Sequence, residues 1–136
     1  MEAKIKDKIE EIEELSFELW EITPNDFDEY LRDYKIKAAC ERYFEKIIGA
    51  VVDLAFLIIK ENRFKIPEED KQAFDILAEE SVISVKLAEK FKDAKGMRNI
   101  IAHNYGELDD EIVFDSITQE IQRDVDEFIN SLNKLN

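Results

Sequence analysis

The sequence predicts an all-α protein, an antiparallel bundle of about five helices. Glycine and proline occur only 3 and 2 times in 136 residues, which leaves few places for the tight turns that join short strands. Apolar side chains recur every three or four residues along several long segments, as they do on one face of an amphipathic helix. The length suits one hydrophobic core, so we predict a single domain over residues 1–136.

The first predicted helix covers residues 2–21 and ends at Thr23 and Pro24, because the residue before proline disfavours helical backbone. Thr23 is then expected to cap, and Pro24 to open, a short helical turn around Tyr30. The apolar stripe of the first helix has spacings of three and four and consists of Ile5, Ile9, Ile12, Leu15 and Leu19.

The longest predicted helix covers residues 35–62, and its apolar face is so wide that we expect it to be buried on more than one side. Gly49 lies inside this helix, where glycine costs about 1 kcal/mol relative to alanine. We therefore expect Gly49 to mark the close approach of another helix or another subunit.

Three further helices are predicted. Pro67 and the three acids after it indicate a helix start, because proline and acidic side chains suit the first turn. Ser84 is expected to cap the next helix, which Gly96 interrupts. Asp109 is expected to cap the last helix, whose stripe is Phe114, Ile117, Ile121, Val125, Phe128 and Leu132.

The composition excludes several classes of protein. With 19 cationic and 33 acidic side chains the net charge is −14, which excludes a protein that coats nucleic acid by charge alone. The single Cys40 cannot form an internal disulfide. The N-terminus has no signal-peptide pattern, and no apolar run approaches the ~20 residues that span a bilayer. We expect a cytoplasmic protein without membrane contact.

We expect neither a metal site nor a cofactor. One histidine and one cysteine make a zinc site improbable. The acidic triplets at 68–70 and 109–111 are interpreted as favourable charges at helix starts rather than as metal ligands. The sequence also has no glycine-rich phosphate loop and no serine nucleophile elbow.

Residues 97–105 read Met-Arg-Asn-Ile-Ile-Ala-His-Asn-Tyr and contain the only histidine of the chain. Arg98 and His103 are five residues apart, so on a straight helix their side chains differ by roughly 140° beyond a full turn. Either the helix ends between them, or a pocket wraps around its last turn. The Asn-Tyr-Gly turn signal at 104–106 favours a helix end close to His103.

An arginine and a histidine near each other suit RNA cleavage without a metal. The 2′-hydroxyl attacks the neighbouring phosphate, His103 moves a proton, and Arg98 stabilises the added negative charge. The reaction prefers both an acid and a base, which a symmetric dimer would supply as two histidines. Between residues 86 and 98, five cations and two acids leave a local charge of +3, so Lys92 and Lys95 are candidate RNA contacts.

A structural interpretation competes with the catalytic one. A lone histidine near a helix end is commonly a cap or a satisfied polar group, and a tyrosine before glycine is commonly a packed turn residue. Spacing alone therefore favours a structural role for His103 and Tyr105.

The pattern formed by Arg98, four residues, His103, one residue and Tyr105 resembles the signature of HEPN-fold ribonucleases, and of the HepT family in particular. The likeness extends over roughly residues 30–133. It implies an all-helical homodimer whose catalytic residues are Arg98 and His103, with Asn99 positioning the phosphate or His103.

The resemblance also implies a biological role. The chain would be the toxin of a type VII HepT/MntA toxin–antitoxin pair, a metal-independent endoribonuclease that cleaves RNA, including tRNA. A MntA-like nucleotidyltransferase would silence it by transferring AMP from ATP to Tyr105.

Two alternatives remain open at the level of the sequence. In the first alternative to the toxin interpretation, the chain is a non-catalytic substrate-binding subunit of a minimal nucleotidyltransferase. In the second, it is a plain dimeric helical scaffold. Both predict no RNA cleavage, whereas the toxin interpretation predicts cleavage that is lost with His103.

Overall fold

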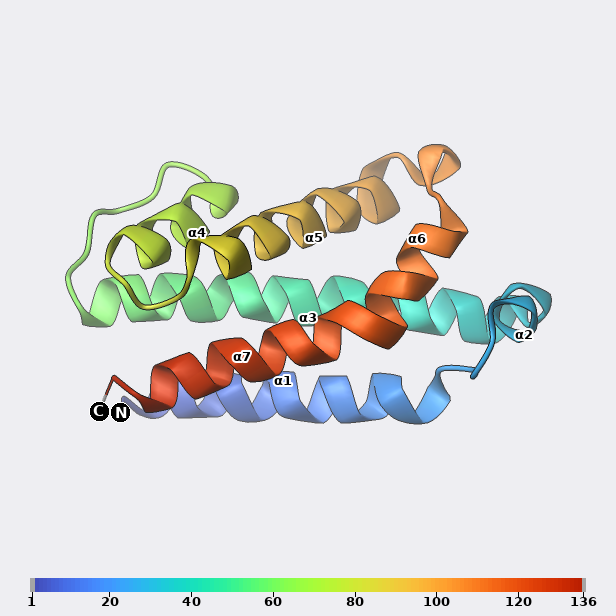
Figure 1. Cartoon of the computed structure of the whole chain (residues 1–136), viewed down its shortest axis with the longest axis horizontal. Coiled ribbons are helices and arrows are strands. Elements are labelled where there is room, and N and C mark those ends of the chain that lie inside the picture. The colour runs from blue at the N-terminus through green and yellow to red at the C-terminus, as the bar shows by residue number, and fades with distance from the viewer. Residues whose placement is uncertain (1, 136) are drawn as a thin grey trace.

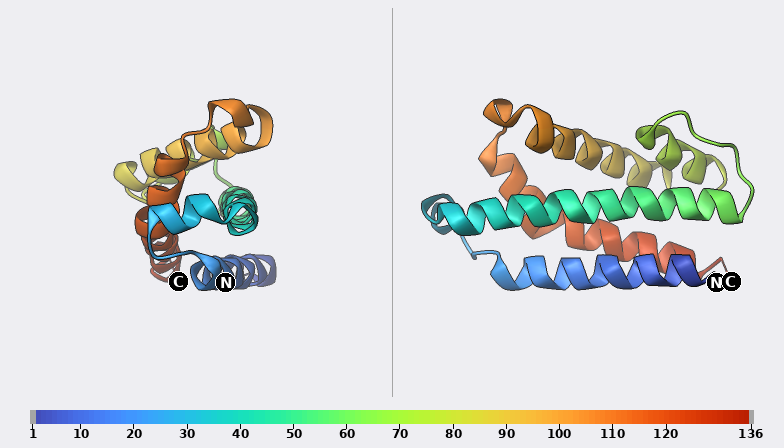
Figure 2. Two further views of the ribbon diagram at one scale, coloured as in Figure 1. Left: turned by 90° about the vertical axis from the view of Figure 1, so that its right-hand side faces the viewer. Right: turned by 180° about the vertical axis from the view of Figure 1, so that it is seen from behind.

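A computed structural model describes residues 2–135, and every regular element in that range is a helix. The long helix α3 (Tyr34–Glu61) lies at the centre, between α1 (Ala3–Ile22) below and the pair α4 (Asp70–Glu79) and α5 (Val85–His103) above (Figure 1). The view from behind shows α1 and α3 side by side, with both chain ends at the same end of the bundle (Figure 2). The predicted all-α antiparallel bundle is confirmed.

The remaining elements close the other end of the bundle. Short helix α2 (Phe27–Arg32) joins α1 to α3. After α5, the chain turns through η1 (Tyr105–Glu107) and continues as α6 (Asp110–Asp115), the π-helical turn η2 (Ser116–Glu120) and α7 (Ile121–Asn133). The predicted last helix is therefore interrupted by a π-turn, and α7 returns beside α1 (Figure 1).

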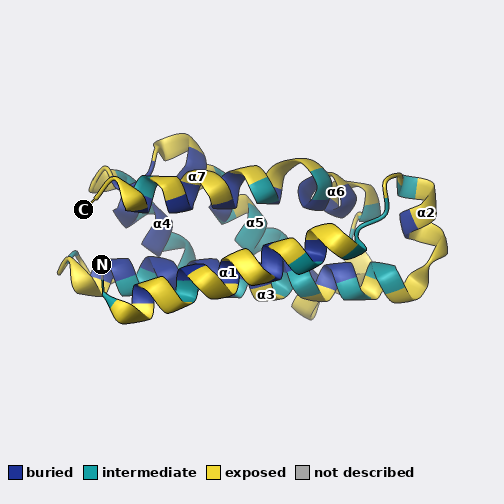
Figure 3. Ribbon diagram, turned by 90° about the horizontal axis from the view of Figure 1, so that it is seen from below, coloured by how far each residue is buried: buried dark blue, intermediate teal, exposed yellow. Residues whose placement is uncertain are grey.

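The helices bury the stripes that the sequence predicts. Figure 3 shows buried positions on the inner faces of α1, α3 and α7 and exposed positions on their outer faces. All stripe residues of the first and last predicted helices are buried. Complete burial of one such aliphatic or aromatic side chain is worth about 1.5–3 kcal/mol.

Two groups of aromatic rings fix α5 and α6. The ring centroid of Phe91 on α5 lies 5.2 Å from that of Phe74 on α4 and 5.4 Å from that of Phe128 on α7. At the other end, Phe114 on α6 lies 5.1 Å from Tyr30 on α2. These contacts hold the two segments that flank residues 98–105 against the rest of the core.

Two expected helix starts are wrong. Thr23 ends α1 instead of capping α2, because its hydroxyl donates to the Leu19 carbonyl at 2.6 Å. Asp26 caps α2 by accepting from the Glu29 N–H at 2.8 Å. Pro67 is buried in the connector, and α4 begins later, at Asp70.

Both expectations about glycine also need correction. Helix α5 runs through Gly96 without a break, because the small intrinsic cost of one glycine is outweighed by the hydrogen bonds and packing around it. At Gly49, a Cβ atom would meet nothing within 4 Å in the described part of the chain. The close approach of another helix to Gly49 is therefore wrong for a single chain, while the approach of a second subunit stays a prediction.

None of the described helices is both long enough and apolar enough to cross a membrane.

Candidate active site

Helix α5 carries most of the motif. Ser84 caps its start by accepting from the Leu87 N–H at 3.0 Å. The helix ends at His103, where the N–H of Asn104 donates to the Ile100 carbonyl at 2.9 Å. The predicted helix end close to His103 is confirmed.

Arg98 lies on the inner stripe of α5. It is spaced four residues from Ala94 and three from the buried Ile101, and its side chain is half-buried. Its Nε is buried and has no hydrogen-bond partner within residues 2–135. A buried donor without a partner costs roughly 1–3 kcal/mol, so such groups are rare and often functional. Arg98 therefore has a donor that no residue of the described chain satisfies, and guanidinium groups commonly donate to oxyanions.

His103 is exposed on the last turn of α5. Its imidazole is accessible to solvent. Arg98 and His103 thus lie on the same helix, but one side chain is on the inner stripe and the other is at the solvent-facing end. A pocket that uses both has to wrap around the last turn of α5, as expected from their spacing.

Tyr105 is held by a polar network that crosses three elements. Its Oη donates to Oε1 of Glu41 at 2.6 Å and accepts from Nζ of Lys37 at 3.0 Å. Lys37 also forms ion pairs with Glu41 at 2.8 Å and with Asp110 at 3.1 Å. Its ammonium lies 5.3 Å from the centroid of the Tyr105 ring. The turn after α5 is thereby tied to the start of both α3 and α6.

The network shifts the pKa values of Tyr105 and Lys37. Burial, and then the hydrogen bond to Glu41, raise the pKa of the Tyr105 phenol above its ordinary value. Burial by itself lowers the pKa of Lys37, but hydrogen bonds to Glu41, Tyr105 and Asp110 outweigh that effect and raise it. At neutral pH the phenol therefore keeps its proton and Lys37 keeps its charge.

The network residues Lys37, Glu41 and Asp110 were not predicted as site residues. One signal for Glu41 is present in the sequence, because it precedes Phe44 by three positions and Ile48 by seven and so lies on a buried stripe. Only 4% of its surface is exposed. An acid in such a stripe, four residues after a lysine, indicates a buried ion pair.

Lys92 and Lys95, earlier on α5, differ from Arg98 because they have acidic partners. Lys92 pairs with Asp75 at 3.0 Å, and Lys95 pairs with Asp70 at 3.3 Å, so both carboxylates come from α4. Lys95 also donates to the side-chain oxygen of Asn99 at 3.1 Å. The local positive charge counted along the sequence is thus partly offset in space. Asn99 contacts Lys95, and its role in positioning a phosphate stays a prediction.

A metal centre does not form from the described residues, because no three His, Cys, Asp or Glu side chains converge. Cys40 is buried, with its Sγ 3.8 Å from the Thr23 hydroxyl. Burial, as the main cause, raises the pKa of its thiol, so Cys40 is unsuited to act as a nucleophile.

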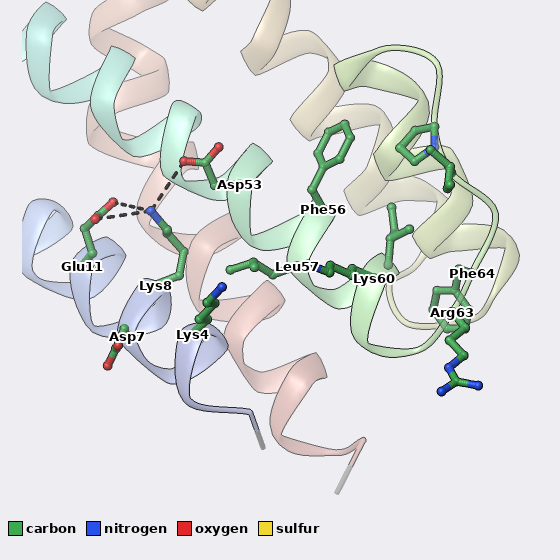
Figure 4. Close-up of a pocket in the computed structure, with 13 residues that line it drawn as sticks. Lys4, Asp7, Lys8, Glu11, Asp53, Phe56, Leu57, Lys60, Arg63 and Phe64 are labelled. Carbon is green, nitrogen blue, oxygen red and sulfur yellow. Dashed lines mark hydrogen bonds and ion pairs between the residues drawn. The ribbon is translucent and has the colours of Figure 1, made fainter.

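A large groove lies away from the motif, and none of residues 98–105 line it (Figure 4). It measures about 1000 Å³ and lies between α1, the end of α3 and the connector before α4. Lys8 crosses it to pair with Glu11 at 3.3 Å and Asp53 at 3.5 Å. Its lining contains neither histidine nor tyrosine. A smaller cavity of about 470 Å³ lies beside α5, lined by Met97, Ile100 and Leu108 among others.

The chain is similar to one family of known proteins. The family model described as "Ribonuclease HepT-like" matches residues 5–132. The chain is 26% identical over 105 residues to the mRNA nuclease HepT of Shewanella oneidensis, covering 77% of this chain and 78% of that protein. It is 25% identical over 96 residues to the tRNA nuclease HepT of Aphanizomenon flos-aquae, covering 71% of this chain and 65% of that protein.

Solved structures show the same fold. One is described as a tri-AMPylated Shewanella oneidensis HEPN toxin in complex with MNT antitoxin; it has a TM-score of 0.91 and 25% identity, and 98% of this chain and 99% of the toxin are covered. Another, described as a toxin–antitoxin with AMP-PNP, has a TM-score of 0.90 and 22% identity over 98% and 99% of the two chains.

Proposed function

This chain belongs to the family of HepT-like ribonucleases, and on that premise we propose that Arg98 and His103 are the residues with which it cleaves RNA. The observation that carries the proposal is the half-buried Arg98, whose Nε has no hydrogen-bond partner in the described chain. The exposed His103 follows it about one and a half helical turns later. The relatives are named as nucleases, which favours catalysis over a non-catalytic subunit or a scaffold.

The chemistry follows from these two side chains. The 2′-hydroxyl of the substrate attacks the adjacent phosphorus, and the bond to the 5′-oxygen of the next nucleotide breaks. His103 moves a proton in this step, a contribution typically worth about 10²–10⁴-fold. The Arg98 guanidinium stabilises the extra negative charge on the phosphoryl oxygens, and its fork of N–H donors matches two of them.

A homodimer completes the site in this proposal. One chain supplies a single histidine, whereas cleavage prefers both a proton acceptor and a proton donor. Two α5 ends facing each other across a twofold axis would supply two histidines and two arginines to one cleft. Each subunit is then a single domain over residues 1–136. Because its substrate is cellular RNA, we place the protein in the cytoplasm.

We further infer regulation by a nucleotidyltransferase. The structurally similar Shewanella oneidensis toxin is AMPylated and bound to an MNT antitoxin. In this chain the acceptor is Tyr105, whose side chain is 51% exposed on the turn next to His103. An adenylyl group there adds phosphate charge close to His103, where it competes with RNA. The chain is thus the toxin of a HepT/MntA-type pair.

Expression in a bacterial host tests the proposal. Wild type is expected to arrest growth and fragment RNA, and His103→Ala to do neither. Glu61→Gln is a matched control, because Glu61 is exposed at the far end of α3. It is expected to behave as wild type. Equal growth and equal RNA integrity in the wild-type and His103→Ala cultures, with both proteins folded by circular dichroism, would contradict the proposal.

A further inference from the structure

The hydroxyl of Tyr105 makes two hydrogen bonds to side chains of α3. A phenol oxygen has one proton and two lone pairs. The proton is donated to Glu41 at 2.6 Å, and one lone pair accepts from Lys37 at 3.0 Å. The second lone pair is left for an electrophile. Because the side chain is 51% exposed, an incoming group can approach it from the solvent side.

We propose that Glu41 is the general base that activates Tyr105 for adenylyl transfer, and that Lys37 holds the phenol oxygen and then pairs with the phosphodiester formed on it. The inference rests on the proposed function, because it takes Tyr105 as the AMP acceptor. In this inference the toxin supplies the base for the reaction that inactivates it.

A base is needed because the phenol keeps its proton at neutral pH, and a neutral phenol is a weak nucleophile. Glu41 is within hydrogen-bond reach of that proton, which is the first requirement for a general base. Its carboxylate is almost fully buried and is held by Lys37 at 2.8 Å, so its orientation toward Tyr105 is fixed. No other carboxylate of the described chain accepts a hydrogen bond from Tyr105.

The step balances with ATP as the co-reactant. The Tyr105 oxygen forms a bond to the α-phosphorus, and the bond from that phosphorus to the oxygen that bridges to the β-phosphate breaks. Pyrophosphate leaves with the electron pair of that bond. The phenol proton passes to Glu41 and from there to solvent. Nothing is oxidised or reduced, and the new phosphodiester carries one negative charge beside Lys37.

A purely structural role for Glu41 makes a different prediction. If Glu41 only anchors the turn after α5, glutamine in its place still accepts the Tyr105 hydrogen bond and adenylylation is unchanged. If Glu41 takes the proton, glutamine retains the geometry but not the basicity. Glu41→Gln therefore separates the two roles, and Glu61→Gln on the same helix serves as the control.

The experiment measures AMP transfer by intact-mass spectrometry, with the purified chain, its partner nucleotidyltransferase, ATP and Mg²⁺. Wild type and Glu61→Gln are expected to gain AMP at the same rate, and Tyr105→Phe to gain none. Glu41→Gln is expected to react about 100-fold more slowly. If glutamine prevents folding, Glu41→Asp, which withdraws the carboxylate by one methylene, is expected to be about tenfold slower.

The pH dependence adds a signature that a structural role lacks. The rate deficit of Glu41→Gln is expected to shrink as pH rises toward the pKa of the phenol, because hydroxide then removes the proton. The groups that face the Tyr105 oxygen or its partners are Lys37 and Glu41 on α3, Asp110 on α6 and Tyr30 on α2. Lys37 remains charged over this range.

The outcomes are distinguishable. Glu41→Gln or Glu41→Asp reacting at the wild-type rate overturns the inference and leaves Tyr105 as the AMP acceptor. A deficit of Glu41→Gln that stays constant with pH also overturns it. Wild type that gains no AMP, or that gains it when Tyr105 is phenylalanine, overturns the proposed acceptor and this inference together.

Discussion

The two halves of the motif are built in opposite ways. Arg98 has a buried Nε without a partner in the described chain, and His103 is exposed. Tyr105, two residues later, is fixed by Glu41 and Lys37. Under the proposed roles, the groups that would act on RNA stay available for it, whereas the group that would be modified is held in one orientation. The first half therefore costs stability and the second half contributes to it.

The largest effect that follows from this contrast is a loss of activity without a loss of stability at Arg98. Arg98→Met keeps the aliphatic bulk and removes the unpartnered donor, so unfolding free energy is expected to be unchanged or higher. RNA cleavage is expected to fall about 10²–10³-fold in kcat/KM, because the transition-state charge loses its partner. Urea unfolding and cleavage of a labelled RNA measure the two quantities. A clearly lower midpoint would show that Arg98 has a structural role.

The opposite result is expected at Lys37. Lys37→Met leaves the Glu41 carboxylate almost fully buried without its cation. We expect the free energy of unfolding to fall by about 1.5–3 kcal/mol, the range for hydrogen bonds to charged groups. The double variant Lys37→Met/Glu41→Gln is expected to recover part of this loss, since glutamine needs no counter-charge. No recovery in urea unfolding would mean that Lys37 acts mainly through its packing.

Alkaline titration measures how firmly Tyr105 is held. Its pKa in the folded protein is raised above the ordinary value of about 10, by burial and then by the bond to Glu41. As pH rises above about 10, the unfolded state loses this proton first, so unfolding free energy falls until the folded phenol also ionises. The phenolate absorbance difference between wild type and Tyr105→Phe isolates this group. A transition at or below pH 10 would contradict the hydrogen bond.

The smallest effect is expected at Lys95. Its ion pair joins α5 to Asp70 on α4, and because the Asp70 side chain is half-exposed we expect the pair to contribute about 1 kcal/mol or less. RNA would have to displace Asp70 to reach this cation. Lys95→Ala is therefore expected to weaken RNA binding only about threefold, with reduced salt dependence. A loss as large as that at Arg98 would place Lys95 in the catalytic cleft.

The fold and the end of α5 at His103 were predictable because they depend on local patterns. Apolar spacing predicted the stripes of α1 and α7, and the turn signal after His103 predicted where α5 ends. The hydrogen bonds of Tyr105 with Glu41 and Lys37 were not predictable, because these partners are 64 and 68 residues away in the sequence. The neutralisation of Lys92 and Lys95 by α4 has the same cause.

The errors at element boundaries were also physical. Thr23 has a side chain that can cap a helix start or donate at a helix end, and the choice depends on the neighbouring Asp26, which is the better acceptor at a positively polarised N-terminus. Gly96 weakens a helix in isolation, but tertiary packing decides whether the helix continues.

One comparison of rates tests the central claim most directly. RNA cleavage is measured with purified wild type, His103→Ala and Tyr105→Phe under single-turnover conditions, without a nucleotidyltransferase. We predict a rate about 100-fold or more below wild type for His103→Ala and within about threefold of wild type for Tyr105→Phe. A wild-type rate for His103→Ala, or an equal loss in both variants, would contradict the division of roles between the two halves of the motif.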